Sequence, residues 1–539
     1  MSSSLHGVYA PLPQSLSDSD SEREVTMDPI CTNHTNGLKS AGIIFSGRQN
    51  GHIRLNNIKD DIHCAKTLNL KMSALRKTAF IFSIILCFLP IVIFLWILPC
   101  SDSLTCPKKI SNWETTRENI ELHGVINLVH GAFENNWNII LMYEGSFNNP
   151  RSMKNGIMSF AGTNGAVVWD FQQKSLPSEI NCTILDVNGD GYNDCLVVDE
   201  SGLKAIESTI GEVLWHAHTS EQTSIPELDM PIKINDFDKD GVGDLLAVYR
   251  KETSLVISGK NGLAIANIRL PSGCSYISNL SSSKNRAYIQ YNCGRYQNSE
   301  IVYEISMVDL RAKFEGSQKQ IPFETVDDKD NKVFYVTGDR KLLVENLNHC
   351  PHCEGVISLY NTNNTKLYTQ SFKNAVIMTP VPFSVTSSKE NIVNLKGHLH
   401  GFILKIWLWQ DNSKKLSPST RVYKRSIPVH NETFHLNQVS ERVVLITLRE
   451  NDTQVENVSD SDIYLICNGP EHDNCQPDHK NQQYSLMIAD LDQDSSLELV
   501  SYSSTYEQRE EEGYEAWHLI SKLKVFRLES ELPKLYDKN

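Results

Sequence analysis

Residues 160–171 read FAGTNGAVVWDF, and two later segments repeat this plan: IESTIGEVLWHA at residues 206–217 and ISGKNGLAIANI at residues 257–268. The sixth position of each is a glycine, namely Gly165, Gly211 and Gly262. Glycine accepts the left-handed backbone that a tight turn requires. Each segment is therefore predicted to form a strand, a turn and a second strand that often ends on an aromatic residue.

The spacing of these repeats indicates the fold class. The three glycines are 46 and 51 residues apart, and a weaker fourth copy spans Leu359–Gln370 with Asn364 in the glycine position. Short β-branched and aromatic runs separated by Gly, Asn and Asp predict an all-β protein. A period near 50 residues is typical of a β-propeller with one four-stranded blade per repeat, and roughly 430 residues predict about seven or eight blades. Two stacked β-sandwich domains are the alternative architecture.

Acidic loops of one form lie between the repeats. In each nine-residue loop, oxygen-bearing side chains occupy positions 1, 3, 5 and 9, and an apolar strand follows. These residues are Asp186, Asn188, Asp190 and Asp194 in loop 1; Asp236, Asp238, Asp240 and Asp244 in loop 2; and Asp490, Asp492, Asp494 and Glu498 in loop 3. Such a set, with the carbonyl at position 7, suits Ca²⁺, which accepts six to eight oxygens in irregular geometry. The predicted role of the ion is structural, since a full protein ligand set leaves no open position for chemistry.

Two other kinds of acidic loop share part of this pattern. An EF-hand is excluded because position 12 would be Val197, Ala247 or Ser501 instead of a bidentate glutamate, and because the flanking runs resemble strands. Acidic hairpin turns without an ion remain open, most of all for loop 3, where Ser495 replaces the favoured glycine.

The cysteines indicate an oxidising compartment. From Cys100 onward ten cysteines fall into close pairs, which suggests local disulfides. These pairs are Cys100/Cys106, Cys182/Cys195, Cys274/Cys293, Cys350/Cys353 and Cys467/Cys475. The Cys350-Pro-His-Cys353 motif is also compatible with a redox pair or half of a zinc site, but neither a βαβ context nor a second ligand pair is evident.

An uncharged stretch, Ala79–Leu98, predicts a transmembrane helix, because twenty residues at about 1.5 Å each cover the roughly 30 Å core of a bilayer. Lysines and arginines are denser before it than after it, which places the amino-terminal side in the cytoplasm. Six of seven Asn-x-Ser/Thr acceptors follow it, at Asn181, Asn279, Asn363, Asn431, Asn451 and Asn457. The sequence thus predicts a glycosylated, single-pass type II membrane protein at the cell surface or in an endomembrane.

These signals give four predicted regions: a disordered cytoplasmic tail (1–78), a signal anchor (79–98), a stalk (99–120) and a propeller (121–539). In the tail, Tyr9-Ala-Pro-Leu12 is similar to a tyrosine-based signal read by clathrin adaptors. The chain carries a net charge of −14. Its acidic outer part argues against nucleic acid as a partner.

The loops followed by apolar strands resemble the calcium-binding FG-GAP repeat of the integrin alpha propeller. The whole layout, with the anchor leading into Leu98-Pro-Cys100 and the Gly-x-x-x-Trp segments, is similar to a family of single-pass type II membrane proteins with such repeats. The literal FG and GAP signatures are absent. The resemblance implies a receptor-like or adhesion-like propeller that binds another protein without catalysis. A quinoprotein-like propeller enzyme is the alternative, although the adjacent Cys-Cys pair common in those enzymes is missing.

Overall fold

The structure is a computed structural model, and it divides into two compact units, Met1–Pro99 and Cys100–Asn539, which are taken separately. The residues it describes are 77–86, 88, 112–131, 136–146, 154–269, 274–282, 287–294, 300–314, 324–326, 333–350, 352–386, 398–410, 414–415, 434–448, 453–468, 474–494, 496–511 and 514–528.

In the first unit, residues 77–86 and 88 are helical and expose their large apolar side chains, with Phe82 at 65% and Phe88 at 60%. Within the described part of the chain, no helix is both long and apolar enough to cross a membrane. Most of the cytoplasmic tail, the Tyr9–Leu12 motif and residues 89–98 of the predicted anchor lie outside the described residues.

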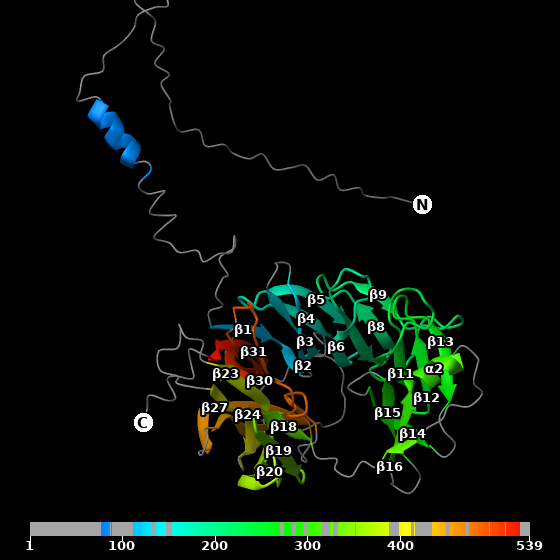
Figure 1. Ribbon diagram of the computed structural model, residues 1–539. Coiled ribbons are helices and arrows are strands. Elements are labelled where there is room, and N and C mark those ends of the chain that lie inside the picture. Colours follow the sequence, from blue (N-terminus) through cyan, green and yellow to red (C-terminus); the bar gives the residue numbers. More distant parts are fainter. Residues whose placement is uncertain are drawn as a thin grey trace, which may run out of the picture. The chain divides into compact units, whose positions relative to one another are not determined.

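The second unit is all-β, and its described strands form seven sheets, numbered here in chain order (Figure 1). Sheet 1 contains β2 (Ile120–His130), β3 (Trp137–Gly145), β4 (Asn155–Ala161) and β5 (Val167–Gln173). Sheet 2 contains β6 (Pro177–Leu185), β7 (Asp194–Asp199), β8 (Gly202–Ile206) and β9 (Val213–His216). Sheet 3 contains β10 (Ile232–Lys233), β11 (Leu245–Tyr249), β12 (Thr253–Ile257) and β13 (Ala264–Arg269). In each of these sheets the strands pair antiparallel in sequence order.

Sheets 4 and 5 repeat this order, and sheet 6 is larger. Sheet 4 contains β14 (Tyr276–Ser282), β15 (Tyr288–Gly294), β16 (Glu300–Ser306) and β17 (Glu324–Val326), with α2 (Met307–Phe314) before β17. Sheet 5 contains β18 (Phe334–Thr337), β19 (Arg340–Leu347), β20 (Glu354–Asn361) and β21 (Lys366–Lys373). Sheet 6 contains β22 (Ala375–Ile377), β23 (Val381–Thr386), β24 (His398–Trp409), β25 (Lys414–Lys415), β26 (Phe434–Leu448), β27 (Thr453–Asn468) and β28 (Cys475–Gln476).

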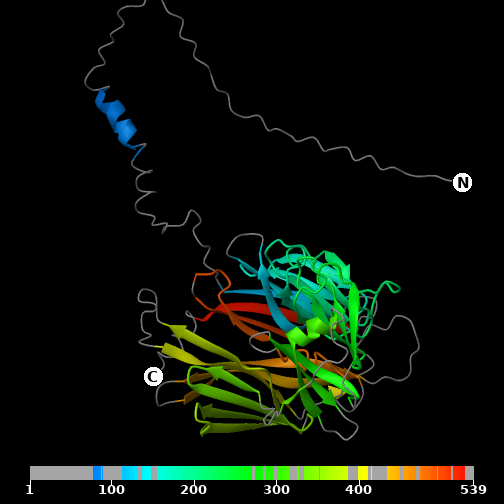
Figure 2. The same ribbon diagram turned by 45° about the vertical axis from the view of Figure 1, so that its right-hand side comes forward.

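Sheet 7 joins the two ends of the propeller. It contains β29 (Leu486–Ala489), β30 (Glu498–Glu511) and β31 (Tyr514–Arg527), and its fourth strand is β1 (Trp113–Glu118). The pairing of β1 with β31 runs from Trp113 opposite Val525 to Glu118 opposite Ile520, and Figures 1 and 2 show these strands side by side. The predicted boundary at residue 121 is therefore too late, because the segment assigned to the stalk already supplies a strand of the last sheet.

Buried apolar clusters hold neighbouring sheets together. Among the described residues they join sheet 7 to 1, 1 to 2, 2 to 3, 3 to 4, 5 to 6 and 6 to 7. Between sheets 2 and 3, for example, Leu203 and Ala205 pack with Leu245, Ala247 and Ile257. Sheets 1, 2, 3, 6 and 7 thus each pack against a neighbouring sheet on both faces, as propeller blades do.

Each repeated segment forms a strand, a turn and a second strand, as the sequence predicts, and these are the third and fourth strands of its sheet. Their turn residues have positive φ angles: +70° at Gly165, +77° at Gly211, +77° at Gly262 and +59° at Asn364. An L side chain rarely adopts this backbone, which explains the recurrence of glycine and asparagine.

A second constraint on these glycines comes from the preceding sheet. The indole Nε1 of Trp169 in sheet 1 donates to the carbonyl of Ser208 in sheet 2 at 3.0 Å, and the ring lies against Gly211. Trp215 of sheet 2 repeats this with the carbonyl of Gly259 in sheet 3 at 3.0 Å, against Gly262. We call this arrangement the tryptophan lock; it explains why tryptophan and glycine recur together.

The tryptophan lock also connects sheet 7 to sheet 1. Trp113 of β1 donates from Nε1 to the carbonyl of Gly162 at 2.8 Å and packs against Gly165. Sheets 2 and 3 each receive a tryptophan from the preceding sheet, and β1 of sheet 7 supplies the corresponding tryptophan to sheet 1. The sequence pattern alone did not identify Trp113 as a member of the repeat.

Four of the five predicted cysteine pairs are disulfide-bonded: Cys182–Cys195, Cys274–Cys293, Cys350–Cys353 and Cys467–Cys475. The Cys350–Cys353 bond lies in the loop between β19 and β20. This disulfide and the Cys467–Cys475 disulfide both pack in the apolar cluster that contains the buried Trp407. This placement matches the structural interpretation of the motif. Cys100 and Cys106 lie outside the described residues.

Candidate metal centre

The three acidic loops occupy equivalent places in their sheets, because each joins the first strand to the second. Loop 1 (Asp186–Asp194) connects β6 to β7, loop 2 (Asp236–Asp244) connects β10 to β11, and loop 3 (Asp490–Glu498) connects β29 to β30. The flanking elements are strands, which agrees with the exclusion of an EF-hand.

The acid at position 9 anchors every loop in the same way. One of its carboxylate oxygens accepts the backbone N–H of position 2, which closes the loop across seven residues. The three bonds are Val187 to Asp194 at 2.9 Å, Phe237 to Asp244 at 2.7 Å and Leu491 to Glu498 at 2.9 Å. The acids themselves are at most 1% exposed.

The other loop positions share a second pattern, in which side-chain oxygens accept backbone N–H groups further along the loop. The position 3 oxygen accepts from position 5, and the position 5 carboxylate accepts from position 7. For position 3, these bonds are Asp190 to Asn188 at 2.9 Å, Asp240 to Asp238 at 3.1 Å and Asp494 to Asp492 at 3.3 Å. For position 5, they are Tyr192 to Asp190 at 2.8 Å, Val242 to Asp240 at 2.9 Å and Ser496 to Asp494 at 2.9 Å. Loop 3 thus follows the same backbone plan as the other two.

The position 1 acid orients the turn. Asp186 accepts the N–H groups of Gly189 at 2.7 Å and Gly191 at 2.9 Å, and Asp236 likewise accepts from Lys239 at 2.6 Å and Gly241 at 3.0 Å. Partial desolvation opposes the ionisation of Asp236, but these N–H groups outweigh it and lower its pKa. This carboxylate is therefore ready to bind a cation at neutral pH.

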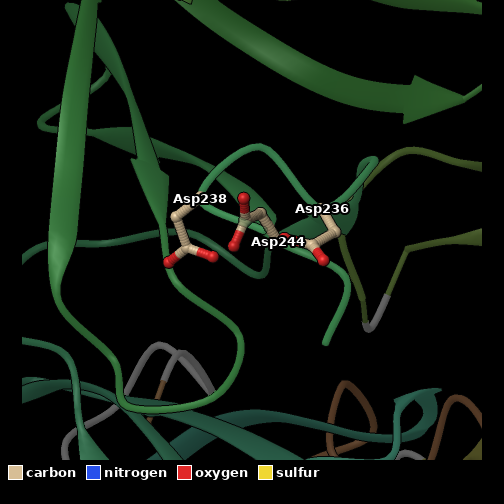
Figure 3. A group of neighbouring side chains, drawn as sticks. All are labelled: Asp236, Asp238 and Asp244. Carbon is tan, nitrogen blue, oxygen red and sulfur yellow. The ribbon is translucent and has the colours of Figure 1, made fainter. Parts of the chain in front are cut away.

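Two sets of carboxylates converge closely. One oxygen each from Asp236, Asp238 and Asp244 lie within 4.8 Å of one another, and Figure 3 shows these three side chains turned toward a common point. In loop 3 the converging residues are Asp490, Asp492 and Glu498.

The predicted ligands at position 5, Asp240 and Asp494, are not members of these sets. In loop 1, no three carboxylates converge within the same distance among the described residues. In loops 2 and 3 the structure therefore brings part of the predicted ligand set together. Loop 1 shares the hydrogen-bond pattern of the other two loops, but its carboxylates do not converge in this way.

Burial of the position 9 acids disfavours their ionised form. The pKa of Asp194 is raised to about 6, mainly by burial. The hydrogen bond from the N–H of Val187 lowers this pKa in part, and the charge of Glu207 contributes to raising it. Burial likewise raises the pKa of Asp244 to about 6 and that of Glu498 to about 7, with Asp238 and Asp492 adding repulsion. A cation beside these groups would stabilise their ionised form.

The residues of loop 3 pass a further test of fit to a metal ion. The Oε1 atom of Glu498 is buried and has no hydrogen-bond partner, although its Oε2 atom accepts from Leu491. A buried carboxylate oxygen without a partner is costly. The donor set consists of oxygens only, which favours calcium or magnesium over the softer transition metals.

Three residues beside the loops were missed by the sequence analysis. Each comes directly after, or at the end of, the third strand of its sheet, so it reaches the loop from the side. In loop 1 the amide of Asn188 donates to Glu207, and in loop 2 the Oγ atom of Ser258 donates to Asp240 at 3.1 Å. In loop 3 the guanidinium of Arg527 pairs with Asp494.

A repeat-based signal exists for two of them. Glu207 and Ser258 are both the second residue of their repeated segment, so alignment of the segments places them at one position. Arg527 has no such signal, because β30 and β31 are 14 residues each and shift the offset from the loop.

Comparison with known proteins gives a partial match. Residues 147–333 match the family model described as the FAM234A/B beta-propeller. This region contains loops 1 and 2 and the three glycine-centred segments. The match supports a β-propeller.

Curated relatives match over a similar share of the chain. Protein FAM234A of Rattus norvegicus is 22% identical over 218 residues, which are 38% of this chain and 39% of that protein. Protein FAM234A of Mus musculus is 23% identical over 223 residues, 38% of this chain and 40% of that protein. The match thus spans about two fifths of these relatives' length.

Among solved structures, BBS1N in complex with ARL6DN, soaked with lead, is 10% identical and covers 75% of this chain and 92% of that chain. The TM-score of this pair is 0.32.

Proposed function

We propose that this chain is a non-enzymatic, single-pass type II membrane protein, which presents a calcium-stabilised, glycosylated propeller of seven blades to another protein. The observation that carries the proposal is the hydrogen-bond plan common to the three acidic loops. The same backbone arrangement recurs at the same place in three sheets, which favours a common ligand over three unrelated polar turns.

The ion in this proposal is structural calcium. It would be held by the predicted residues at positions 1, 3, 5 and 9 of loops 1 and 2 and by those at positions 1, 3 and 9 of loop 3, where the position 5 acid pairs with Arg527. It would supply positive charge to the buried acids at position 9. Calcium is favoured over magnesium because it tolerates irregular coordination by many oxygens. No step of chemistry is assigned to it.

The membrane part of the proposal rests on the sequence of residues 79–98 and on the flanking lysines and arginines. The exposed apolar helix at residues 77–86 and 88 is consistent with it. The acceptor asparagines Asn279, Asn363 and Asn457 are exposed, and Asn181 is partly exposed, so they are accessible for glycosylation. Binding of a clathrin adaptor at Tyr9–Leu12 is part of the same proposal.

The first experiment measures thermal unfolding of the full-length chain in detergent micelles, first freed of metal and then titrated with CaCl₂ or MgCl₂. Calcium at about 100 times its Kd should stabilise the folded state by roughly 2.7 kcal/mol per site. Asp236→Ala combined with Asp240→Ala should remove the contribution of loop 2. The matched control is Asp339→Ala, in the turn between β18 and β19, which is equivalent in position but has no acidic loop.

If the unfolding midpoint of the metal-free protein does not change when calcium is added, the calcium proposal is contradicted. Equal calcium responses of the wild type and the loop 2 double variant would exclude loop 2 as a site.

The binding function needs a separate measurement. Proximity labelling at the cell surface and in endomembranes, with the full-length chain as bait, should recover a reproducible protein in calcium. The loop 2 double variant serves as the comparison bait. Absence of any reproducible partner from both compartments would count against a binding protein.

A further inference from the structure

One residue distinguishes loop 3 from the other two loops. Arg527, at the end of β31, directs its guanidinium to the loop: Nη2 pairs with Asp494 at position 5, and Nη1 lies 3.9 Å from Asp492 at position 3. The arginine side chain is only 8% exposed, and that of Asp492 is 1% exposed. A buried positive charge therefore already faces two of the four predicted ligands.

The corresponding neighbours of the other loops carry no positive charge. Glu207 beside loop 1 is acidic, and Ser258 beside loop 2 is neutral. Lys260 also reaches loop 2, but its Nζ atom donates to the backbone carbonyl of Asp240 at 3.1 Å and leaves the carboxylates free of an ion pair. Among the described residues, no side-chain cation forms an ion pair with a carboxylate of loop 1 or loop 2.

The backbone around Arg527 fixes its position. Its N–H donates to Asn112 Oδ1 at 2.8 Å, and the next residue, Leu528, donates to the carbonyl of Leu497 within loop 3 at 2.9 Å. The arginine is therefore held between loop 3 and the residue that precedes β1. The guanidinium is a rigid planar group, so it loses less entropy per hydrogen bond than a lysine does when it pairs with a carboxylate.

We propose that Arg527 is the internal cation of loop 3, and that it determines how this loop responds to calcium. Loop 3 keeps its closed form in the absence of calcium, because Arg527 compensates Asp492 and Asp494. Calcium enters among Asp490, Asp492 and Glu498 only against the repulsion of the guanidinium, so its affinity there is about tenfold or more below that of loop 2, in line with the dependence of such sites on ligand charge. The inference rests on the proposed calcium function of the loops.

The test compares hydrogen exchange of loop 2 and loop 3 in the full-length wild-type chain, with calcium and with a chelator. Removal of calcium should increase exchange at the amides of Phe237, Asp240 and Val242, while those of Leu491 and Asp494 keep their protection. Equal loss of protection in both loops would overturn the role of Arg527. No change in either loop would instead refute the calcium function itself, and the inference with it.

A substitution then assigns the effect to the arginine. Arg527→Gln removes the charge, so loop 3 should lose protection in chelator, regain it in calcium and bind calcium about tenfold more tightly. Arg527→Lys keeps the charge and should retain the weak calcium affinity of the wild type. The control is Arg509→Gln, on the same sheet, whose exposed partner is Glu118. Unchanged calcium affinity of loop 3 in Arg527→Gln would also overturn the proposal.

Discussion

Replacement of Gly211 with alanine should destabilise the propeller much more than the same replacement at Gly189. Both residues have nearly the same backbone, with φ of +77° and +79°. A methyl group at Gly211 would lie 2.7 Å from two ring atoms of Trp169, whereas a methyl group at Gly189 would meet nothing within 4 Å. The pair therefore separates the cost of the backbone from the cost of the tryptophan lock.

The magnitudes follow from these two terms. A left-handed backbone costs a non-glycine residue about 1–2 kcal/mol, and this applies to both variants. Overpacking against a buried ring adds about 1–3 kcal/mol, and this applies to Gly211→Ala alone. We expect losses of about 2–5 kcal/mol for Gly211→Ala and about 1–2 kcal/mol for Gly189→Ala.

The assay is denaturant unfolding of the full-length variants in chelator, so that the position of Gly189 within loop 1 does not add a metal effect. Gly262→Ala should behave like Gly211→Ala, because its methyl group would lie 2.6 Å from the Trp215 ring. In a Trp169→Leu background, Gly211→Ala should cost less than it does in the wild type, because the ring that clashes with the added methyl group is absent. Equal losses for Gly211→Ala and Gly189→Ala would refute the lock as an energetic contact.

Two further predictions concern buried charges near the junctions between sheets. Burial, and to a smaller extent the nearby charge of Glu144, raises the pKa of Glu121 from 4.5 to about 8. The folded chain therefore retains a proton that the unfolded chain releases. The stability that this proton contributes is complete below pH 4.5 and is lost as the pH rises toward 8. Urea unfolding between about pH 5 and 8 should show Glu121→Gln gaining on the wild type by roughly 1.4 kcal/mol per pH unit, and parallel profiles would contradict this. Lys405 is 1% exposed, and its Nζ atom donates to the carbonyl of Tyr502 at 2.6 Å and lies 3.8 Å from Glu441 Oε2. Lys405→Ala should lower the free energy of unfolding by about 3–5 kcal/mol, because it leaves the buried Glu441 without its ion-pair partner. Lys405→Met combined with Glu441→Gln should cost less than Lys405→Ala alone, and the opposite order would exclude the ion pair as the cause.

The sequence predicts those parts of the fold that depend on local constraints. The positive φ at positions 165, 211 and 262 favours glycine, so glycine recurs there. The nine-residue loops are stabilised by their own side-chain oxygens, so acidic residues recur at fixed positions within them. Both repeats are visible in the sequence without a structure. The close spacing of the cysteines likewise reflects strands that are adjacent in one sheet.

Features that depend on long-range pairing leave no such repeat. The partner of β1 is β31, about 400 residues away, so nothing in the local sequence of Trp113–Glu118 distinguishes a blade strand from a stalk. Arg527 is equally hidden, because it reaches loop 3 from the far end of a long hairpin. In sheet 6 the strands extend to 16 residues, and the period of the earlier repeats is lost there.

The tryptophan lock and the acidic loop meet at a single residue in sheets 2 and 3. In sheet 2 this residue is Ser208, whose N–H points to Asp194 of loop 1 at 3.4 Å while its carbonyl accepts from Trp169 at 3.0 Å. In sheet 3 the residue is Gly259, with its N–H 3.4 Å from Asp244 and its carbonyl 3.0 Å from Trp215 Nε1. The buried acid of each loop therefore orients the peptide that receives the tryptophan of the preceding sheet. Because an ion beside that acid would fix its charge and position, calcium in these loops would stabilise the contact between neighbouring sheets as well as the loop that holds it.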